Sequence, residues 1–220
     1  MMDLIKNSPV AYAQQALITK MGVVNGMEVA LEFSGANIES SIKNVLGVTD
    51  VSCLNRFGIK GPQAAKWLES QGFKTPVDFN AWVENNGCLV MRLGGNEFLL
   101  EDQFGVNNID KLASFNQAKV AGAYKVARAD AAYLLAGSAV LNMLSELCML
   151  DLRDSALPKN GLVMTQVAGI SATLLRQQLN NEQVYRVWCD GTYGAYMWGM
   201  LLEIASELGG GAVGLSSHFR

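Results

Sequence analysis

The chain has 220 residues, of which half are apolar and 17% are charged, and its formal net charge at pH 7 is -3. This length and apolar content allow a sizeable core in one domain or two small ones, which excludes global disorder. The acidic balance argues against nucleic acid as the main partner, because backbone binding relies on a basic surface. The longest apolar runs are broken well before a membrane-spanning length and no basic-then-apolar leader opens the sequence, so we expect a cytoplasmic protein that does not contact a membrane.

Residues 1–44 are expected to form an N-terminal arm with one or two strands. Within it, Met27–Phe33 alternates apolar and polar residues, which is the pattern of a half-buried strand. Such an arm could pack on its own domain or on another chain.

A first α/β unit is expected over residues 45–120. Val51–Lys60 is rich in apolar residues and ends at Gly61, which permits a sharp exit from a strand, and Pro62 suits the first position of a helix. Gly72 is placed where that helix would end. The remaining elements expected in this unit are a short helical piece at Val77–Glu84, strands at Cys88–Leu93 and Glu97–Glu101 joined by Gly94-Gly95, and a helix near Asn108–Phe115.

The same order of elements recurs over residues 121–208. Gly137 follows an expected strand at Ala129–Ala136 and therefore occupies the place of Gly61. The next helix carries an apolar face from Val140 to Cys148, with Ser138 as a possible N-cap. Two strands follow, Gly169–Leu179 and Gln183–Asp190, with Asn180-Asn181 at the turn. A last helix begins near Thr192 and ends at Gly209, and its apolar stripe consists of Met197, Leu201, Ile204 and Leu208. The sequence thus predicts an α+β fold of two diverged strand-helix-strand-strand-helix units with mainly antiparallel sheets.

The end of the chain is expected to be a flexible tail over residues 209–220, because a triglycine opens it. His218, the only histidine, lies in this tail. Catalytic dyads and metal sites built on histidine are therefore not expected, since each needs a positioned imidazole. The four cysteines, at positions 53, 88, 148 and 189, are too far apart for a Cys-x-x-Cys site and are expected to be reduced and mostly buried.

Several segments resemble one family. Gly47–Gly72 reads G-x-x-D-V-S-x-L-x-R-F-x-I-x-G-P-x-A-A-x-W-L, which resembles the early part of the glycine-cleavage T-protein (aminomethyltransferase) superfamily. Met91–Leu100 resembles the strand, turn and strand of that family. Leu150–Arg153 and Val184–Leu201 are similar to its short members, typified by the gamma subunit of heterotetrameric sarcosine oxidase. The resemblance covers most of residues 45–205 and implies a T-protein-like folate-binding fold without the C-terminal barrel domain, for which this chain has no room.

One departure from the family bears on activity. Full-length aminomethyltransferases carry a G-G-x-x-D-D loop whose acid lies beside the folate-bound one-carbon unit, whereas Asn85–Val90 contains no acid here. The resemblance therefore implies a noncatalytic assembly subunit of a sarcosine oxidase-like amine-oxidising flavoenzyme, whose larger flavin-binding subunits would hold FAD, FMN and NAD. The alternative is a stand-alone tetrahydrofolate-binding protein or an aminomethyltransferase-like one-carbon enzyme.

Five charged residues are the candidates for cofactor binding in a central cleft: Asp50, Arg56, Arg92, Glu97 and Arg153. An arginine can hold a carboxylate or a folate tail by paired hydrogen bonds. The competing interpretation is that Asp50 caps a turn, that Arg56 and Arg92 lie on outer strand faces, and that Arg153 pairs with Asp151 or Asp154. No catalytic residue and no metal ligand is predicted.

Aromatic residues are densest near the end of the chain, at Tyr185, Trp188, Tyr193, Tyr196 and Trp198. Such residues pack cores, bury area against other subunits and stack on flat cofactors such as pterins or flavins. Strand alternation followed by helical spacing means that they cannot all face one ligand, so the three roles stay open at this point.

Overall fold

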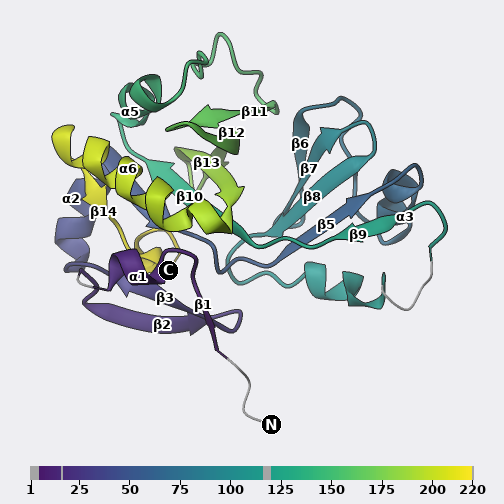
Figure 1. Cartoon of the computed structure of the whole chain (residues 1–220), viewed down its shortest axis with the longest axis horizontal. Helices are drawn as coiled ribbons and strands as arrows, with labels where there is room; N and C mark the ends of the chain where they lie inside the picture. The colour runs from purple at the N-terminus through teal and green to yellow at the C-terminus, as the bar shows by residue number, and fades with distance from the viewer. Residues whose placement is uncertain (1–4, 16, 116–119, 220) are drawn as a thin grey trace. The chain divides into compact units, whose positions relative to one another are not determined.

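The computed structural model describes residues 5–15, 17–115 and 120–219, which divide into two units (Figure 1). Unit 1 consists of the described residues within 1–53, 129–159 and 163–220, and unit 2 of those within 54–128 and 160–162. This division differs from the boundaries expected near residues 44, 120 and 208. Residues 5–53 form no separate arm, since they belong to the same unit as the second half of the chain.

The centre of unit 1 is a six-stranded sheet. In sheet order its strands are β11 (Leu162–Val167), β12 (Ile170–Leu179), β13 (Glu182–Asp190), β10 (Asp130–Ala136), β4 (Gly47–Asp50) and β14 (Gly211–Ala212). The four strands from β12 to β4 pair antiparallel, whereas β14 runs parallel to β4. Asn180 and Asn181 have φ values of 50° and 64° between β12 and β13, which confirms the hairpin turn predicted there.

Helices α5 (Val140–Leu147) and α6 (Gly194–Glu207) supply apolar side chains to the core of unit 1. Their buried residues recur at helical spacing, as the sequence predicted for both helices, and are Val140, Met143, Leu144, Met197, Trp198, Leu201 and Ala205. The predicted cap at Ser138 is not used, since Ala139 is the N-cap residue of α5 and no side chain caps it. Cys148 and Cys189 belong to the same core, and both are buried free thiols, as predicted.

A three-stranded sheet carries most of the N-terminal residues of unit 1. Its order is β1 (Lys6–Asn7), β3 (Met27–Glu32) and β2 (Lys20–Val24), and the short helix α1 (Ala11–Gln14) lies between β1 and β2 in the chain. The strand predicted from Met27 is therefore confirmed. Helix α2 (Ala36–Leu46), which follows this sheet, was not predicted from the sequence.

Described residues 209–219 are ordered and do not form the flexible tail that the sequence predicted. Val213 and Leu215 are fully buried, and β14 and the 3₁₀ helix η3 (Leu215–Ser217) lie in this segment. The glycines here permit close backbone contact, since a Cβ on Gly210 would lie 2.1 Å from the carbonyl oxygen of Leu46. The buried carboxylate of Glu39 on α2 also holds the segment, because it accepts hydrogen bonds from the backbone N–H of Gly214 and the hydroxyl of Ser217.

Unit 2 is built on a five-stranded sheet. Its order is β6 (Ala81–Asn85), β7 (Cys88–Gly94), β8 (Glu97–Asp102), β5 (Arg56–Lys60) and β9 (Tyr124–Val126), and all neighbours pair antiparallel. Helix α3 (Ala64–Ser70) and the 3₁₀ helix η1 (Ile109–Ser114) pack on it, close to the predicted positions. The core includes Phe57, Trp67 and Phe115, and the rings of Trp67 and Phe115 meet edge to face with centroids 4.7 Å apart.

The helical piece predicted at Val77–Glu84 is wrong, since β6 occupies Ala81–Asn85 and pairs with β7. Asn80 has a φ of 51°, which a continuing α-helix does not allow. Asn86 and Gly87, with φ values of 52° and 79°, then form a two-residue hairpin turn. The Asn-Gly pair was the sequence signal for this hairpin, and it was missed.

The structure confirms an α+β fold with two related units. The order β6-β7-β8-β5 in unit 2 matches β11-β12-β13-β10 in unit 1, with a helix after the first strand in the chain of each set. Each set has one strand more than predicted, because β6 and β11 were not recognised. The fifth strand of each sheet comes from the other half of the chain. In unit 1, β10 pairs with β4, which lies just before β5 in the sequence. In unit 2, β5 pairs with β9, which lies just before β10 in the sequence.

Candidate functional site

Asp50, the last residue of β4, lies in a buried hydrogen-bonded turn of unit 1. Its carboxylate accepts hydrogen bonds from the Ser8 hydroxyl at 2.5 Å and from the Ser52 backbone N–H at 2.9 Å. The Ser52 hydroxyl in turn accepts a hydrogen bond from the N–H of Ala132 on β10. Capping of a turn by Asp50, one of the two interpretations of this residue, is thus confirmed.

Arg56 forms a buried ion pair in unit 2. It is the register partner of Glu101 on the adjacent strand β8, and its Nε lies 2.5 Å from the Glu101 Oε2. The two side chains are only 6% and 0% exposed. The interpretation that placed Arg56 on an outer strand face is therefore wrong, because the pair lies inside the unit and compensates the Arg56 charge there.

Arg92 holds the loop before β6 against the β7–β8 hairpin. Its guanidinium donates to the carbonyl of Val77 at 2.5 Å and to that of Gly95 at 2.7 Å, and it lies 4.8 Å from the centroid of the Phe79 ring. Glu97 begins the second strand of the same hairpin, partly buried and opposite Lys60 of β5 in the sheet register. Of the five predicted site residues, Arg92 and Glu97 thus share the β7–β8 hairpin.

Arg153 is exposed in unit 1 and pairs with its near neighbour Asp151. The guanidinium donates two hydrogen bonds to this carboxylate, at 2.9 Å and 2.7 Å, and they lower the pKa of Asp151 to about 2. This confirms the alternative in which Arg153 is paired locally. Asp154, the other partner considered, instead accepts a hydrogen bond from Arg176 on β12.

The aromatic residues near the end of the chain divide into two groups. Tyr185, Trp188 and Trp198 are at most 2% exposed, and Tyr185 and Trp198 belong to the core of unit 1. Tyr193 and Tyr196 are about half exposed. Core packing is therefore the role of the first group, and only the second is available to a partner.

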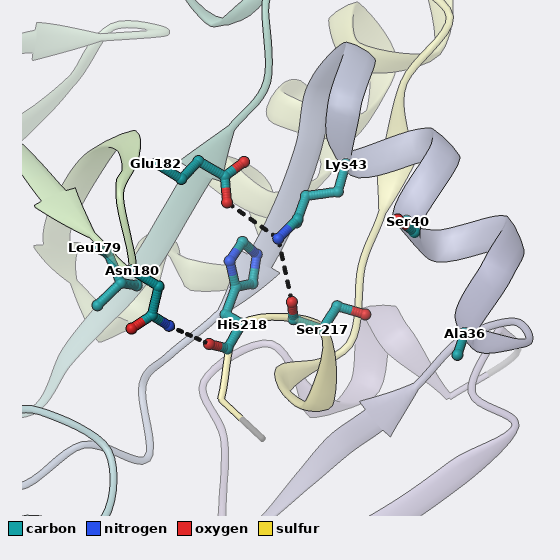
Figure 2. A pocket seen from close by; sticks show the side chains of 8 residues that line it. All are labelled: Ala36, Ser40, Lys43, Leu179, Asn180, Glu182, Ser217 and His218. Atoms are coloured by element: carbon teal, nitrogen blue, oxygen red, sulfur yellow. Dashed lines mark hydrogen bonds and ion pairs between the residues drawn. The ribbon is translucent and has the colours of Figure 1, made fainter.

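One pocket of unit 1, with a volume of about 540 Å³, is polar (Figure 2). Its wall is formed by one face of α2, the β12–β13 turn and the end of the chain, through Ala36, Ser40, Lys43, Leu179, Asn180, Glu182, Ser217 and His218. The Lys43 ammonium lies 3.0 Å from the Glu182 carboxylate and donates to the carbonyl oxygen of Ser217 at 3.2 Å. The Asn180 amide donates to the carbonyl oxygen of His218 at 3.1 Å. Three segments that are far apart in the sequence thus line this pocket.

His218 is a buried histidine in the wall of this pocket. Its side chain points toward Lys43 and Glu182 (Figure 2), and the residue is 5% exposed. Burial lowers the pKa of His218 to about 3, assisted by the positive charges of Lys43 and Arg186, so the imidazole is neutral at pH 7. The sequence had placed this histidine in a flexible tail, and only the apolar residues Val213 and Leu215 before it indicated a packed segment.

A second pocket of unit 1, of about 600 Å³, lies in the N-terminal segment between β1 and β2. Its lining includes Tyr12 and Met21, which are 88% and 41% exposed. Further apolar side chains of the same N-terminal segment are also exposed, namely Ile5, Leu17 and Val23. The N-terminal segment therefore presents exposed apolar side chains of a kind that suits contact with another protein.

Among the described residues, no group of three or more His, Cys, Asp or Glu side chains is arranged to hold a metal ion. Within the same residues, no helix combines the length and apolarity that a membrane crossing needs.

Residues 11–218 match the family model of the GCVT N-terminal domain. The chain belongs to the GCVT N-terminal domain family. This confirms the family that the motifs between residues 45 and 205 indicated. Among curated proteins, a sequence search finds no significant match.

Two solved structures share the GCVT-type fold with the chain. One is aminomethyltransferase T of the glycine cleavage system from Bartonella henselae, with a TM-score of 0.74 and 17% identity over 97% of this chain and 61% of that one. The other is a chain of heterotetrameric sarcosine oxidase from Corynebacterium sp. U-96, with a TM-score of 0.66 and 20% identity over 91% of this chain and 95% of that one. The chain thus spans 61% of the length of the aminomethyltransferase, and the likeness establishes a T-protein-like fold.

Proposed function

We propose that this chain is a noncatalytic subunit that supports the assembly of a heterotetrameric, sarcosine oxidase-like amine-oxidising flavoenzyme in the cytoplasm. The observation that carries the proposal is the coverage of the two structural relatives. A chain of the Corynebacterium oxidase is matched over 95% of its length, whereas the aminomethyltransferase is matched over 61%. In such a complex, the larger partner subunits hold FAD, FMN and NAD, and this chain has no catalytic role of its own.

The local chemistry of the predicted site residues supports a noncatalytic role. Asn85–Val90, where full-length aminomethyltransferases carry an acidic loop, here consists of the end of β6, the two-residue turn Asn86-Gly87 and the start of β7. Arg56 is already paired with Glu101, and Arg92 with backbone carbonyls. A folate carboxylate would have to displace these partners before either guanidinium could bind it.

The exposed apolar side chains of the N-terminal segment supply a surface for subunit contact. Soluble proteins seldom leave such side chains grouped on their surface unless a partner covers them. We therefore assign Tyr12 and Met21, which line one pocket there, to the contact with a larger subunit.

The test is affinity purification of the chain from its native cells, followed by size-exclusion chromatography and an absorbance spectrum. The expected result is a complex with larger, flavin-containing subunits in fixed proportion. Tyr12→Ser combined with Met21→Ser is expected to lower the yield of those subunits. The matched control is Val77→Ser, because Val77 is 87% exposed in unit 2 and should leave the yield unchanged. A colourless monomer would count against the proposal.

A second candidate function, binding of tetrahydrofolate by the chain alone, is favoured by its membership of the GCVT N-terminal domain family. A stand-alone aminomethyltransferase-like one-carbon enzyme would also need this binding. Titration calorimetry with tetrahydrofolate tests it directly, and a saturable heat together with a raised melting temperature would support it. The absence of both would remove this candidate.

A further inference from the structure

The pocket drawn in Figure 2 contains hydrogen-bond donors that its described contacts do not use up. The Glu182 carboxylate is paired with Lys43, and the carbonyl oxygens of Ser217 and His218 accept from Lys43 and Asn180. The Lys43 ammonium has three N–H groups and the Asn180 amide has two, so each retains one beyond these described contacts. The Ser40 hydroxyl, on the same face of α2 as Lys43, adds a further donor to the pocket wall.

The imidazole of His218 adds an independent observation. Its residue is 95% buried, and its Nε2 has no hydrogen-bond partner among the described residues. Buried polar atoms in native proteins are nearly always hydrogen-bonded, so an unpartnered nitrogen in a pocket wall is suited to contact a bound polar group.

Two positively charged side chains act on the imidazole. Lys43 approaches from α2 and Arg186 from β13, and both lower the pKa of His218, while Glu182 of β13 is the one carboxylate of the pocket lining. Lys43 and Glu182 are partly shielded, with side chains 19% and 31% exposed. An incoming anion would therefore gain from Lys43 and Arg186 and would compete with Glu182 for the ammonium of Lys43.

We propose that this pocket binds a small oxyanion, a carboxylate or phosphate group, anchored by Lys43 and by hydrogen bonds from Ser40, Asn180 and His218. The volume of about 540 Å³ lies within the range of small-molecule sites, so the oxyanion can belong to a compact organic acid or ester rather than to a bare ion. The proposal does not depend on the proposed function, because all of these residues belong to unit 1 of this chain.

Because His218 is the only histidine, its imidazole can be followed without assignment. The full-length chain, labelled with ¹⁵N-histidine, is titrated by NMR with inorganic phosphate and, separately, with acetate. Chloride at matched ionic strength corrects for screening. The expected result is a saturable shift of the imidazole signals with at least one of the two oxyanions and none with chloride. The oxyanion that binds more tightly identifies the preferred head group.

Two variants and one control test whether the pocket binds a negatively charged group. Lys43→Met is expected to weaken binding about tenfold or more, as loss of a charged hydrogen-bond partner does. Glu182→Gln is expected to tighten binding, because the competing carboxylate is gone. Lys20→Met is the control, since Lys20 is paired with Glu32 on the N-terminal sheet and lies outside the pocket lining.

Two outcomes would overturn the proposal. One is the absence of a saturable shift with both oxyanions in the wild type and in the folded Glu182→Gln variant. The other is weaker oxyanion binding in the folded Glu182→Gln variant, which would show that Glu182 helps to hold the ligand site instead of competing for Lys43. Ser40→Ala provides a second variant in case Lys43→Met does not fold, and its expected effect is weaker binding with an unchanged circular dichroism spectrum.

Discussion

Gly61 and Gly137 occupy the same position in the two units, each directly after a strand and shortly before a helix. Their φ values are +120° and +115°. A Cβ at Gly61 would lie 2.4 Å from the carbonyl oxygen of Gly122, and one at Gly137 would lie 2.5 Å from the carbonyl oxygen of Lys43. Both strand-to-helix turns therefore need a residue without a side chain, for the backbone angle and for space.

Gly61→Ala and Gly137→Ala are each expected to lower the free energy of unfolding by about 1–3 kcal/mol, the cost of a backbone conformation that L-residues avoid. Equilibrium urea unfolding measures this. Gly199→Ala is the contrast, because Gly199 is exposed in the middle of α6 with open space around its Cα. This variant should raise the free energy of unfolding by about 0.5–1 kcal/mol. Wild-type stability in either of the first two variants would show that the turn can relax.

The buried ion pair of unit 2 is expected to respond asymmetrically to mutation. Arg56→Met leaves Glu101 charged and buried, which costs about 3–5 kcal/mol of stability. The double variant Arg56→Met, Glu101→Leu should recover much of this loss, because no charge remains unpaired. Denaturant unfolding of both variants and of Glu101→Leu gives the coupling between the two residues. Arg153→Met is the control, and its exposed pair should leave stability unchanged within error.

His218 is expected to make the protein sensitive to acid. Its pKa is lowered from 6.5 to about 3 in the folded state, so the unfolded chain binds the proton more readily. The contribution of the neutral imidazole is therefore present above pH 6.5 and is lost as the pH falls toward 3, by at most about 5 kcal/mol. Unfolding curves of wild type and His218→Gln across this range should differ in slope. Parallel curves would mean that the imidazole is solvated.

Asp102 at the end of β8 should show the opposite dependence on pH. Burial raises the pKa of its carboxyl above 3.8, against the opposing hydrogen bond from the Ile109 N–H, and burial also raises the pKa of its register partner, the Cys88 thiol. Because the folded state disfavours the ionised carboxyl, its contribution to stability is present below pH 3.8 and is lost as the pH rises through the folded pKa. Asp102→Asn is therefore expected to raise the free energy of unfolding at pH 7 and to do so less at about pH 4. A stabilisation that does not change with pH would exclude ionisation as its cause.

Elements with local turn chemistry were predictable from the sequence. Gly61 and Gly137 marked the strand-to-helix turns, Asn180-Asn181 marked a hairpin, and the apolar faces of α5 and α6 marked core helices. Helix α2 was not predicted, although Ile38, Ile42 and Val45 recur at helical spacing, because residues 1–44 were interpreted as an extended arm. The burial of Glu39, whose carboxylate accepts hydrogen bonds from the N–H groups of Phe33 and Ser34, could not be inferred from that pattern.

The candidate site was less predictable, because side-chain partners depend on register and on long-range contacts. Arg56 faces Glu101 across 45 positions of sequence, and only the alignment of β5 with β8 brings them together. Arg153 and Asp151, two positions apart, could be paired from the sequence alone. His218 was placed in a tail because the triglycine before it reads as flexible, whereas Gly210 is required by its close approach to Leu46.

The placement of β4 has a consequence for the order in which the protein folds during synthesis. All five strands of the unit 2 sheet lie between Arg56 and Val126, so that sheet can close soon after these residues leave the ribosome. β4 leaves earlier, yet its partner β10 begins only at Asp130 and its other neighbour β14 at Gly211. At about 5–20 residues per second, β4 waits some seconds for the first and longer for the second. The strand made first among the two large sheets is thus among the last to be fully paired.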